Sequence, residues 1–309
     1  MQEYMRRPMV MLAGEQAAPN LLPTRCLEPA HILILHTDFP QSENAAKNLR
    51  LRMGNTAVTL QPIAAYDPNA AAVSIQGYLR EYPQALVNIT GGTKPMSIAA
   101  LIAAKAANCT PFYVRSQQAQ TILDFYNFDE AGIPWITEAL TIEDTISIDD
   151  HLTVYFGQNY HFTGFGDGPG RIFEEAIFAT LDTTVDEVRI GWKHKSGAVD
   201  VDFIVRCNNQ IGIIEAKSGN RAASTEGIKQ LAVAGGQRFF GTYTKRILVV
   251  DQDWTSKSNN LELAKALGIV LVELPRFAAL KSLGAEEQRQ LSTAILNALG
   301  KPINRQVAT

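Results

Sequence analysis

Short apolar runs alternate with longer runs of helical periodicity along the first half of the chain. The apolar runs that predict β-strands cover residues 8–12, 31–36, 57–63, 85–89, the vicinity of Phe112, and 122–126. Apolar residues recur at helical spacing over 44–53, 70–81 and 95–107. This alternation is typical of a mainly parallel, doubly wound sheet, in which ligands bind at the carboxyl ends of the strands.

The second half contains two apolar strands, up to Val205 and from Ile211, joined by the polar turn 207–210. Glu215 and Lys217 lie two apart on the second strand, so their side chains share a face. Hairpin pairing of the two strands can bring Asp202 beside them. Upstream, residues 170–178 have apolar positions at helical spacing, and such a helix could bring another carboxylate to the sheet.

An Asp followed by Glu-x-Lys is the residue set that a metal-dependent nuclease needs. Two carboxylates can hold a divalent ion beside a phosphodiester, and a lysine can orient water or offset charge on phosphorus. The alternative is a chance match at two strand ends, because short motifs have a high false-positive rate. The buried character of the strand ending in Glu215 and Lys217 favours the nuclease, because burying charges is unfavourable unless they are paired or metal-bound.

A second candidate site follows the strand that ends at Ile89. The loop Thr90-Gly91-Gly92-Thr93-Lys94 leads into an alanine-rich helix with Pro95 in its first turn. Glycines allow backbone N–H groups to approach a ligand, and a helix N-terminus with a lysine favours phosphate. The alternative is an ordinary strand-to-helix turn with a solvated lysine. Neither a Walker loop nor a GxGxxG motif is present.

The composition is that of a globular chain with room for two domains. Of 309 residues, 46% are apolar and 19% charged, and the net charge of −3 excludes a strongly basic surface. Three separated cysteines and five scattered histidines indicate neither a disulfide framework nor a zinc site. No apolar run approaches the about 20 residues of a membrane span, so we expect a soluble, cytoplasmic protein without membrane partners.

Four motifs taken together resemble a family of CRISPR-associated nucleases. They are Met9–Gln16, Pro19–Pro23, His36–Asp38 and Ile89–Lys94. Members of that family carry a CRISPR-associated Rossmann-fold (CARF) sensor followed by a PD-(D/E)xK nuclease, and the resemblance extends from Met9 to about Leu274. It implies an α/β fold with an N-terminal Rossmann-like CARF domain and a C-terminal restriction-endonuclease-like domain. The expected limits are 1–135 for the sensor, 136–168 for a linker with a small or absent winged-helix insert, and 169–309 for the nuclease.

The resemblance assigns four catalytic residues, Glu174, Asp202, Glu215 and Lys217. The three acids among them are expected to hold Mg²⁺ or Mn²⁺. The family has Trp-Leu before the acidic residue of its helix, whereas this chain has Ile172-Phe173. The difference changes the packing of the helix but retains the acidic residue, Glu174. Asp200 occupies the position at which the family has Glu. It is either an acid that supports the metal-binding carboxylates or a solvent-exposed residue. The pair Gly235-Gly236 matches a family pair that lets a helix end pack close to the sheet.

The resemblance also implies a cyclic oligoadenylate receptor, with cyclic tetra-adenylate as the expected activator bound across the axis of a homodimer. The expected ligand-binding residues are Gly14, Gln16, Thr37, Gly91, Gly92, Thr93 and Lys94. For Gln16 and Thr37 an ordinary strand-to-loop turn is an equal alternative. The implied function is activator-gated nuclease activity in type III CRISPR antiviral defence, nicking or cutting DNA, with single-stranded RNA as the other substrate. Residues 193–195 are candidates for backbone contact, against the alternative of a solvated hairpin.

Three other functions are compatible with parts of the sequence. The chain could be a CARF sensor on a degenerate nuclease scaffold, although all four motif residues are retained. It could be a constitutive restriction or repair endonuclease with an unrelated nucleotide-binding domain, which a test with and without the cyclic ligand distinguishes. A nucleotide-dependent oxidoreductase fits the alternating first half but not the missing GxGxxG motif.

Overall fold

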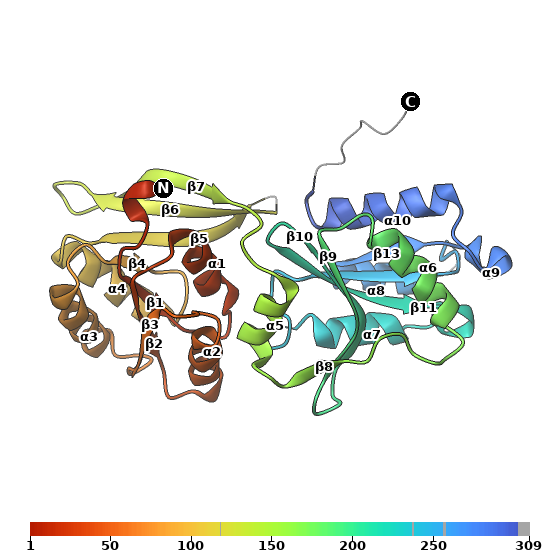
Figure 1. Ribbon diagram of the computed structural model, residues 1–309, viewed down its shortest axis with the longest axis horizontal. Helices are drawn as coiled ribbons and strands as arrows, with labels where there is room; N and C mark the ends of the chain where they lie inside the picture. The colour runs from red at the N-terminus through yellow and green to blue at the C-terminus, as the bar shows by residue number, and fades with distance from the viewer. Residues whose placement is uncertain (118, 237, 256–257, 302–309) are drawn as a thin grey trace. The chain divides into compact units, whose positions relative to one another are not determined.

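The chain folds into two compact units, Met1–Gly157 and Gln158–Thr309 (Figure 1). The computed structural model describes residues 1–117, 119–236, 238–255 and 258–301. The division after Gly157 falls within the segment 136–168 that the sequence suggested as a linker. Of the helices in these described ranges, none has the length and apolar character to cross a membrane.

Unit 1 is built on a seven-stranded sheet of order β3-β2-β1-β4-β5-β6-β7. Its strands are β1 (Met9–Leu12), β2 (His31–His36), β3 (Ala57–Pro62), β4 (Leu86–Asn88), β5 (Thr110–Gln117), β6 (Gln120–Phe128) and β7 (Pro134–Ile142). Neighbours from β3 to β5 pair in parallel, and β6 and β7 extend the sheet antiparallel. The predicted mainly parallel, doubly wound sheet is therefore confirmed, with the 3-2-1-4 order of a Rossmann-type half.

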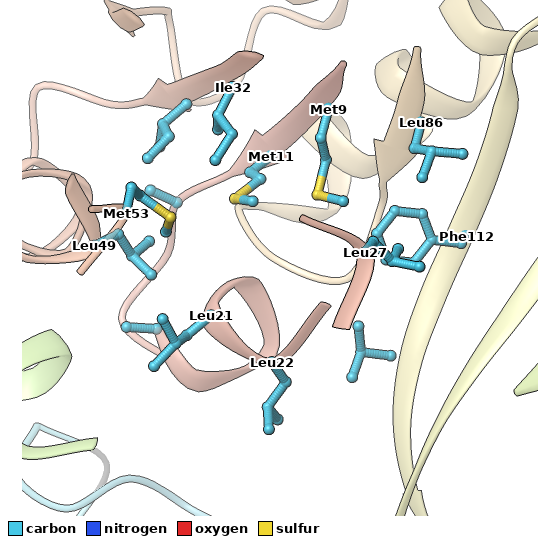
Figure 2. Close-up of a cluster of buried hydrophobic side chains, with 14 of the residues drawn as sticks. Met9, Met11, Leu21, Leu22, Leu27, Ile32, Leu49, Met53, Leu86 and Phe112 are labelled. Carbon is cyan, nitrogen blue, oxygen red and sulfur yellow. The ribbon is translucent and has the colours of Figure 1, made fainter. Parts of the chain in front are cut away.

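Helices cover both faces of this sheet because its inner strands are apolar on both sides. The helices are α1 (Ala18–Leu27), α2 (Pro40–Arg50), α3 (Pro68–Glu81), α4 (Lys94–Ala106) and α5 (Ile148–Phe156), after a short 3₁₀ turn η1 (Gln2–Tyr4). Met9 and Met11 of β1 face α1 and α2, as Figure 2 shows, whereas Val10 and Leu12 pack with α3 and α4. The two clusters follow the alternation of side chains along a strand.

Helix α1 is one of the elements that the apolar pattern did not predict, and it contains two prolines. Pro19 occupies the first turn, where a missing N–H is tolerated. Pro23 lies inside the helix and cannot donate to the carbonyl of Pro19. That carbonyl instead accepts a hydrogen bond of 3.0 Å from the side-chain amide of Asn88 at the end of β4. A tertiary contact thus replaces the missing helical hydrogen bond.

The sequence following β6 contributes to both units. β7 forms the edge of the first sheet, and α5 packs on the α1–α2 side with Val154 in the core. Arg52, just past α2, forms an ion pair with Asp149 at the start of α5. β8 (Tyr160–Phe162) instead pairs with β9 (Glu187–His194) in unit 2.

Unit 2 is built on a six-stranded sheet of order β13-β12-β11-β10-β9-β8. Its other strands are β10 (Asp200–Cys207), β11 (Gln210–Lys217), β12 (Lys245–Val250) and β13 (Ile269–Glu273). β11, β12 and β13 run parallel, while β8 to β11 pair antiparallel. The helical elements are α6 (Arg171–Leu181), η2 (Gly219–Ala223), α7 (Glu226–Ala234), α8 (Ser258–Ala266), α9 (Phe277–Leu280) and α10 (Ala285–Ala298).

The predicted hairpin and upstream helix are confirmed as β10–β11 and α6. One face of the sheet, with Phe203 and Ile214, buries apolar side chains of α6 and α10 such as Phe173 and Leu291. Because side chains alternate, Glu215 points to the opposite face, where α7 packs.

Candidate active site and ligand-binding loops

The end of the β10–β11 hairpin brings Asp202, Glu215 and Lys217 together. The antiparallel register pairs Phe203 with Ile214, and its continuation sets Asp202 opposite Glu215. Asp202 Oδ2 accepts a 2.7 Å hydrogen bond from the backbone N–H of Ala216. Lys217 Nζ donates to Glu215 Oε1 at 2.5 Å, and both residues are buried, with 8% and 2% of their surfaces exposed.

Helix α6 supplies Glu174 in its first turn. Its carboxylate accepts a hydrogen bond from the backbone of Gly166, and it is close enough to influence the ionisation of Asp202 and to be influenced by Lys217. A Cβ on Gly170 would lie 3.5 Å from Glu174 Oε1 and 3.6 Å from Ser218 Oγ, so the helix start sits beside the end of β11. All four predicted catalytic residues therefore lie in one neighbourhood of unit 2.

This acid cluster holds protons more tightly than isolated carboxylates do. The pKa of Asp202 is raised to about 6, chiefly by burial and also by the charge of Glu174, although the hydrogen bond from the Ala216 N–H lowers it. Burial, with Asp202 second, raises the pKa of Glu215 to about 8. Burial also raises the pKa of Glu174. For Lys217, burial disfavours the charge, but the Glu215 carboxylate outweighs it and raises the pKa. Proton retention relieves repulsion among buried carboxylates.

A divalent cation would relieve the same repulsion. Carboxylate oxygens are the ligands that Mg²⁺ and Mn²⁺ prefer, so the chemistry of the donor set fits the predicted metals. Among the residues that the structure describes, however, no three Asp, Glu, His or Cys side chains already form a metal-ligating group. Lys217 Nζ holds Oε1 of Glu215. An ion could bind the other oxygen of that carboxylate, or replace the ammonium at Oε1.

The raised carboxyl pKa values predict that the metal-free protein is less stable at high pH. Raised folded-state pKa values mean that the folded state binds more protons than the unfolded chain, so their contribution is complete below about pH 4. It is lost as pH rises through about 6 for Asp202 and about 8 for Glu215. For Asp202 alone the loss corresponds to about 2–3 kcal/mol.

Thermal unfolding in EDTA at pH 5 and pH 8 tests this expectation. Trp192 and Trp254 are both buried in unit 2, whereas Trp135 of unit 1 is 53% exposed, so the fluorescence change on unfolding comes mainly from unit 2. Glu215→Gln should reduce the pH dependence, whereas Glu262→Gln on the exposed face of α8 should leave it unchanged. Equal stability of the wild type at both pH values would contradict the account.

Two glycine contacts bring α7 against the sheet. A Cβ on Gly227 would lie 2.6 Å from Leu248 Cδ1, 3.3 Å from Lys217 Cγ and 3.6 Å from Glu215 Cγ. A Cβ on Gly235 would lie 2.3 Å from Arg246 Cδ, which agrees with close packing at the helix end. Gly227 was missed by the sequence analysis because one helical glycine gives no pattern of its own.

In unit 1 the opening motif and the Gly-Gly-Thr-Lys loop meet at the carboxyl ends of β1 and β4. A Cβ on Gly14 would lie 3.1 Å from the backbone nitrogen of Gly92. A Cβ on Gly91 would lie 2.0 Å from the carbonyl oxygen of Leu12, so a side chain there is excluded. Gly92 has φ +74°, which favours glycine. The structure therefore brings together Gly14, Gly91 and Gly92.

Two buried asparagines, absent from the predicted site, hold these loops. Asn20 Nδ2 donates to the Leu12 carbonyl at 2.9 Å, and Asn88 Nδ2 donates to Asn20 Oδ1 at 3.0 Å. Asn88 Oδ1 accepts from the N–H of Thr90 at 3.0 Å. Asn20 lies within the Pro19–Pro23 motif and Asn88 directly precedes the Ile89–Lys94 motif, so an amide beside a glycine loop was the available indication.

Thr93 begins α4 as its N-cap. Its hydroxyl accepts from the N–H of Met96 at 3.4 Å and donates to the Ala65 carbonyl at 2.6 Å. Lys94 follows at the first helical position and is exposed. An exposed ammonium at a helix N-terminus is suited to an anion.

Thr37 and Gln16, two of the predicted ligand-binding residues, form hydrogen bonds within the protein. Thr37 is 1% exposed, and its hydroxyl accepts from the N–H of Phe39, which is the turn role weighed as the alternative. Gln16 Oε1 accepts a 3.2 Å hydrogen bond from Tyr155 of α5.

The sequence analysis missed two exposed aromatic residues, Phe39 and Tyr66. They follow β2 and β3 and form an edge-on pair with ring centroids 6.4 Å apart.

The basic residues suggested for nucleic-acid backbone contact lie at the β9–β10 hairpin. Lys193 and Lys195 are exposed, and His194 Nδ1 shares a 2.7 Å hydrogen bond with Ser196 Oγ. Asp200, at the start of β10, is exposed, yet its charge raises the pKa of both Asp202 and Glu215.

Comparison with known proteins supports the assignment of the first unit. Residues 9–150 match the family model of the Card1 CARF domain. The CARF resemblance is thereby confirmed for that region, and the assignment of the second unit to the PD-(D/E)xK nucleases remains a prediction. Among curated proteins, none matches the sequence.

Solved structures share the fold over 79–96% of the chain at low sequence identity. Can2 from Sulfobacillus thermosulfidooxidans, solved in complex with cyclic tetra-adenylate, has a TM-score of 0.69 at 14% identity, covering 96% of this chain and 98% of Can2. Protein VC1899 from Vibrio cholerae has a TM-score of 0.68 at 14% identity, covering 94% and 99%. A type III CRISPR defence DNA nuclease activated by cyclic oligoadenylate has a TM-score of 0.54 at 14% identity. The alignment covers 79% of this chain and 45% of that nuclease.

Proposed function

We propose that the protein is a metal-dependent nuclease of type III CRISPR defence that is activated by a cyclic oligoadenylate, with cyclic tetra-adenylate as the expected ring. The observation that carries this proposal is the buried cluster of Asp202, Glu215 and Lys217 in a chain whose residues 9–150 match the Card1 CARF domain. DNA is the first expected substrate and single-stranded RNA the second.

The ligand site of the proposal is the edge of the unit 1 sheet. The close approach of Gly14 to Gly92 leaves backbone unobstructed by side chains, and the start of α4 with Lys94 offers positive charge to the phosphates. The exposed rings of Phe39 and Tyr66 offer faces on which adenine could stack. Two-fold symmetry of the ring suits an isologous homodimer, in which each protomer supplies half of the site.

In the nuclease site, Asp202 and Glu215 would hold the metal, and Glu174 would complete the oxygen ligands. When bound, Mg²⁺ or Mn²⁺ would polarise the scissile phosphate and acidify a water. Lys217 Nζ, released from Glu215, would orient that water and offset negative charge on the phosphate. The Ala216 N–H fixes one oxygen of Asp202 and leaves the other available. A ligand can gate this chemistry only by binding the active arrangement more tightly.

Removing the Lys94 charge should weaken activator binding by about tenfold, because its ammonium is an exposed cation beside the loop expected to bind phosphate. Isothermal titration of cyclic tetra-adenylate into the full chain measures this for Lys94→Ala. The loss should shrink at high salt, since the contact is electrostatic. Lys47→Ala on α2 removes an equally exposed lysine and should bind as the wild type does. Unchanged affinity in Lys94→Ala would contradict the assignment of this loop.

A further inference from the structure

A pocket of about 220 Å³ in unit 2 adjoins the acid cluster. Its lining residues are Ala198, Val199 and Asp200 from the start of β10, and Lys229, Gln230 and Val233 from α7. On the sheet side, Asp200 is two residues from Asp202 on the same strand face. On the helix side, Gly227 lies three residues before Gln230, on the same side of α7, and packs against Glu215 and Lys217. A group in this pocket would therefore be a close neighbour of a phosphate at the acid cluster.

Two oxygens of the pocket lining can accept hydrogen bonds from a ligand. Gln230 Oε1 is buried and has no hydrogen-bond partner among the described residues. An unsatisfied buried acceptor is unfavourable, and a ligand donor would remove that penalty. Asp200, an exposed carboxylate, adds a second acceptor. Lys229 carries the opposite charge, so the pocket has no excess of positive charge with which to bind the nucleic-acid backbone.

The remaining walls are apolar. Ala198, Val199 and Val233 present hydrocarbon surface, and Val233 is 53% exposed at the rim. The exposed ammonium of Lys229 could bind a backbone phosphate at the mouth of the pocket. Apolar walls with a few acceptors are the environment of a flat heterocycle that carries donors.

We infer that this pocket is a nucleobase subsite of the proposed nuclease, selective for bases that carry an exocyclic amino group. The inference rests on the proposed function. Adenine, cytosine and guanine each carry an exocyclic amino group that could donate to Gln230 Oε1 or Asp200, whereas thymine and uracil offer only the ring N3–H between two carbonyl oxygens. Because each good hydrogen bond changes a rate by up to about tenfold, thymine or uracil should be depleted at one fixed position beside the cleaved bond.

Mapping of cleavage ends tests the inference. The full chain, with Mn²⁺ and cyclic tetra-adenylate, is given plasmid DNA and a mixed-sequence RNA, and the new ends are sequenced. We expect the wild type to show about five- to tenfold depletion of thymine or uracil at one position. Gln230→Leu should abolish the depletion, because leucine is of similar size and offers no acceptor to an amino group. Gln290→Leu, a glutamine on α10, should keep the depletion.

A second variant guards against a folding effect at Gln230. Val233→Trp adds bulk at an exposed rim position and should also remove the base preference. Cleavage without base depletion, or depletion unchanged in both pocket variants, would overturn the subsite and leave the nuclease intact. Absence of any cleavage of DNA and RNA by the wild type would instead overturn the proposed function and the subsite with it.

Discussion

Replacing Lys217 with methionine is expected to reduce activator-dependent cleavage by a factor of about 10²–10³, the range found when one preorganised charge-stabilising group is removed from an active site. Lys217 Nζ is buried and already holds Glu215 Oε1 at 2.5 Å, so no water or neighbouring cation can easily replace it. Methionine keeps the unbranched stem and removes only the charge. Initial rates on plasmid, with Mn²⁺ and saturating cyclic tetra-adenylate, give the comparison.

The control for this variant is Lys265→Met, which removes an exposed lysine from α8. It should cleave at the wild-type rate. Because Glu215 has a raised pKa and can take a proton when its partner is lost, Lys217→Met should remain folded near pH 6. A folded Lys217→Met protein with full metal-dependent cleavage would remove Lys217 from the catalytic assignment.

Gly91→Ala is expected to weaken cyclic tetra-adenylate binding by about 10- to 100-fold. The added Cβ would lie 2.0 Å from the Leu12 carbonyl oxygen, so the loop or the end of β1 must shift. Overpacking of this kind costs about 1–3 kcal/mol, which corresponds to that range in affinity if the shift is confined to the ligand loop. Titration calorimetry measures the affinity, and scanning calorimetry measures the stability of unit 1.

Gly77→Ala is the matched control in the same unit. Gly77 lies within α3, and a Cβ there would meet no atom within 4 Å. Alanine is the better helix former by about 1 kcal/mol, so this variant should bind normally and melt at the same or a higher temperature. Wild-type affinity in Gly91→Ala would show that the close approach of β1 and the glycine loop does not shape the ligand site.

Apolar runs predicted β1 to β6 of unit 1 and the β10–β11 hairpin of unit 2, because buried strands are apolar. They did not predict β7, β8, β9, β12 or β13. The β10–β11 hairpin is the clearest case: Glu215 and Lys217 were expected on one face with Asp202 alongside, and the register sets them so. The Gly-Gly-Thr-Lys loop was likewise predictable, since a strand, two glycines and a capping threonine specify a strand-to-helix turn.

Other features depend on contacts between distant residues and leave no local pattern. Helix α1 was missed because Pro23 argues against a helix until Asn88, far along the chain, satisfies the freed Pro19 carbonyl. β7 and α5 join unit 1 through strand pairing and through packing against α2. The pocket beside Asp200 arises only when α7 packs across β10. Periodicity reports burial within an element, not the partner that it packs against.

The most direct test of the central claim is the ratio of cleavage rates with and without cyclic tetra-adenylate, measured on the full chain in Mn²⁺ with supercoiled plasmid and with single-stranded RNA. Allosteric coupling commonly changes a binding equilibrium by about 5- to 150-fold. A gated nuclease should therefore cleave at least one substrate at least about fivefold faster with the ligand. Equal rates with and without the ligand, or no cleavage of either substrate at saturating ligand, would contradict the account.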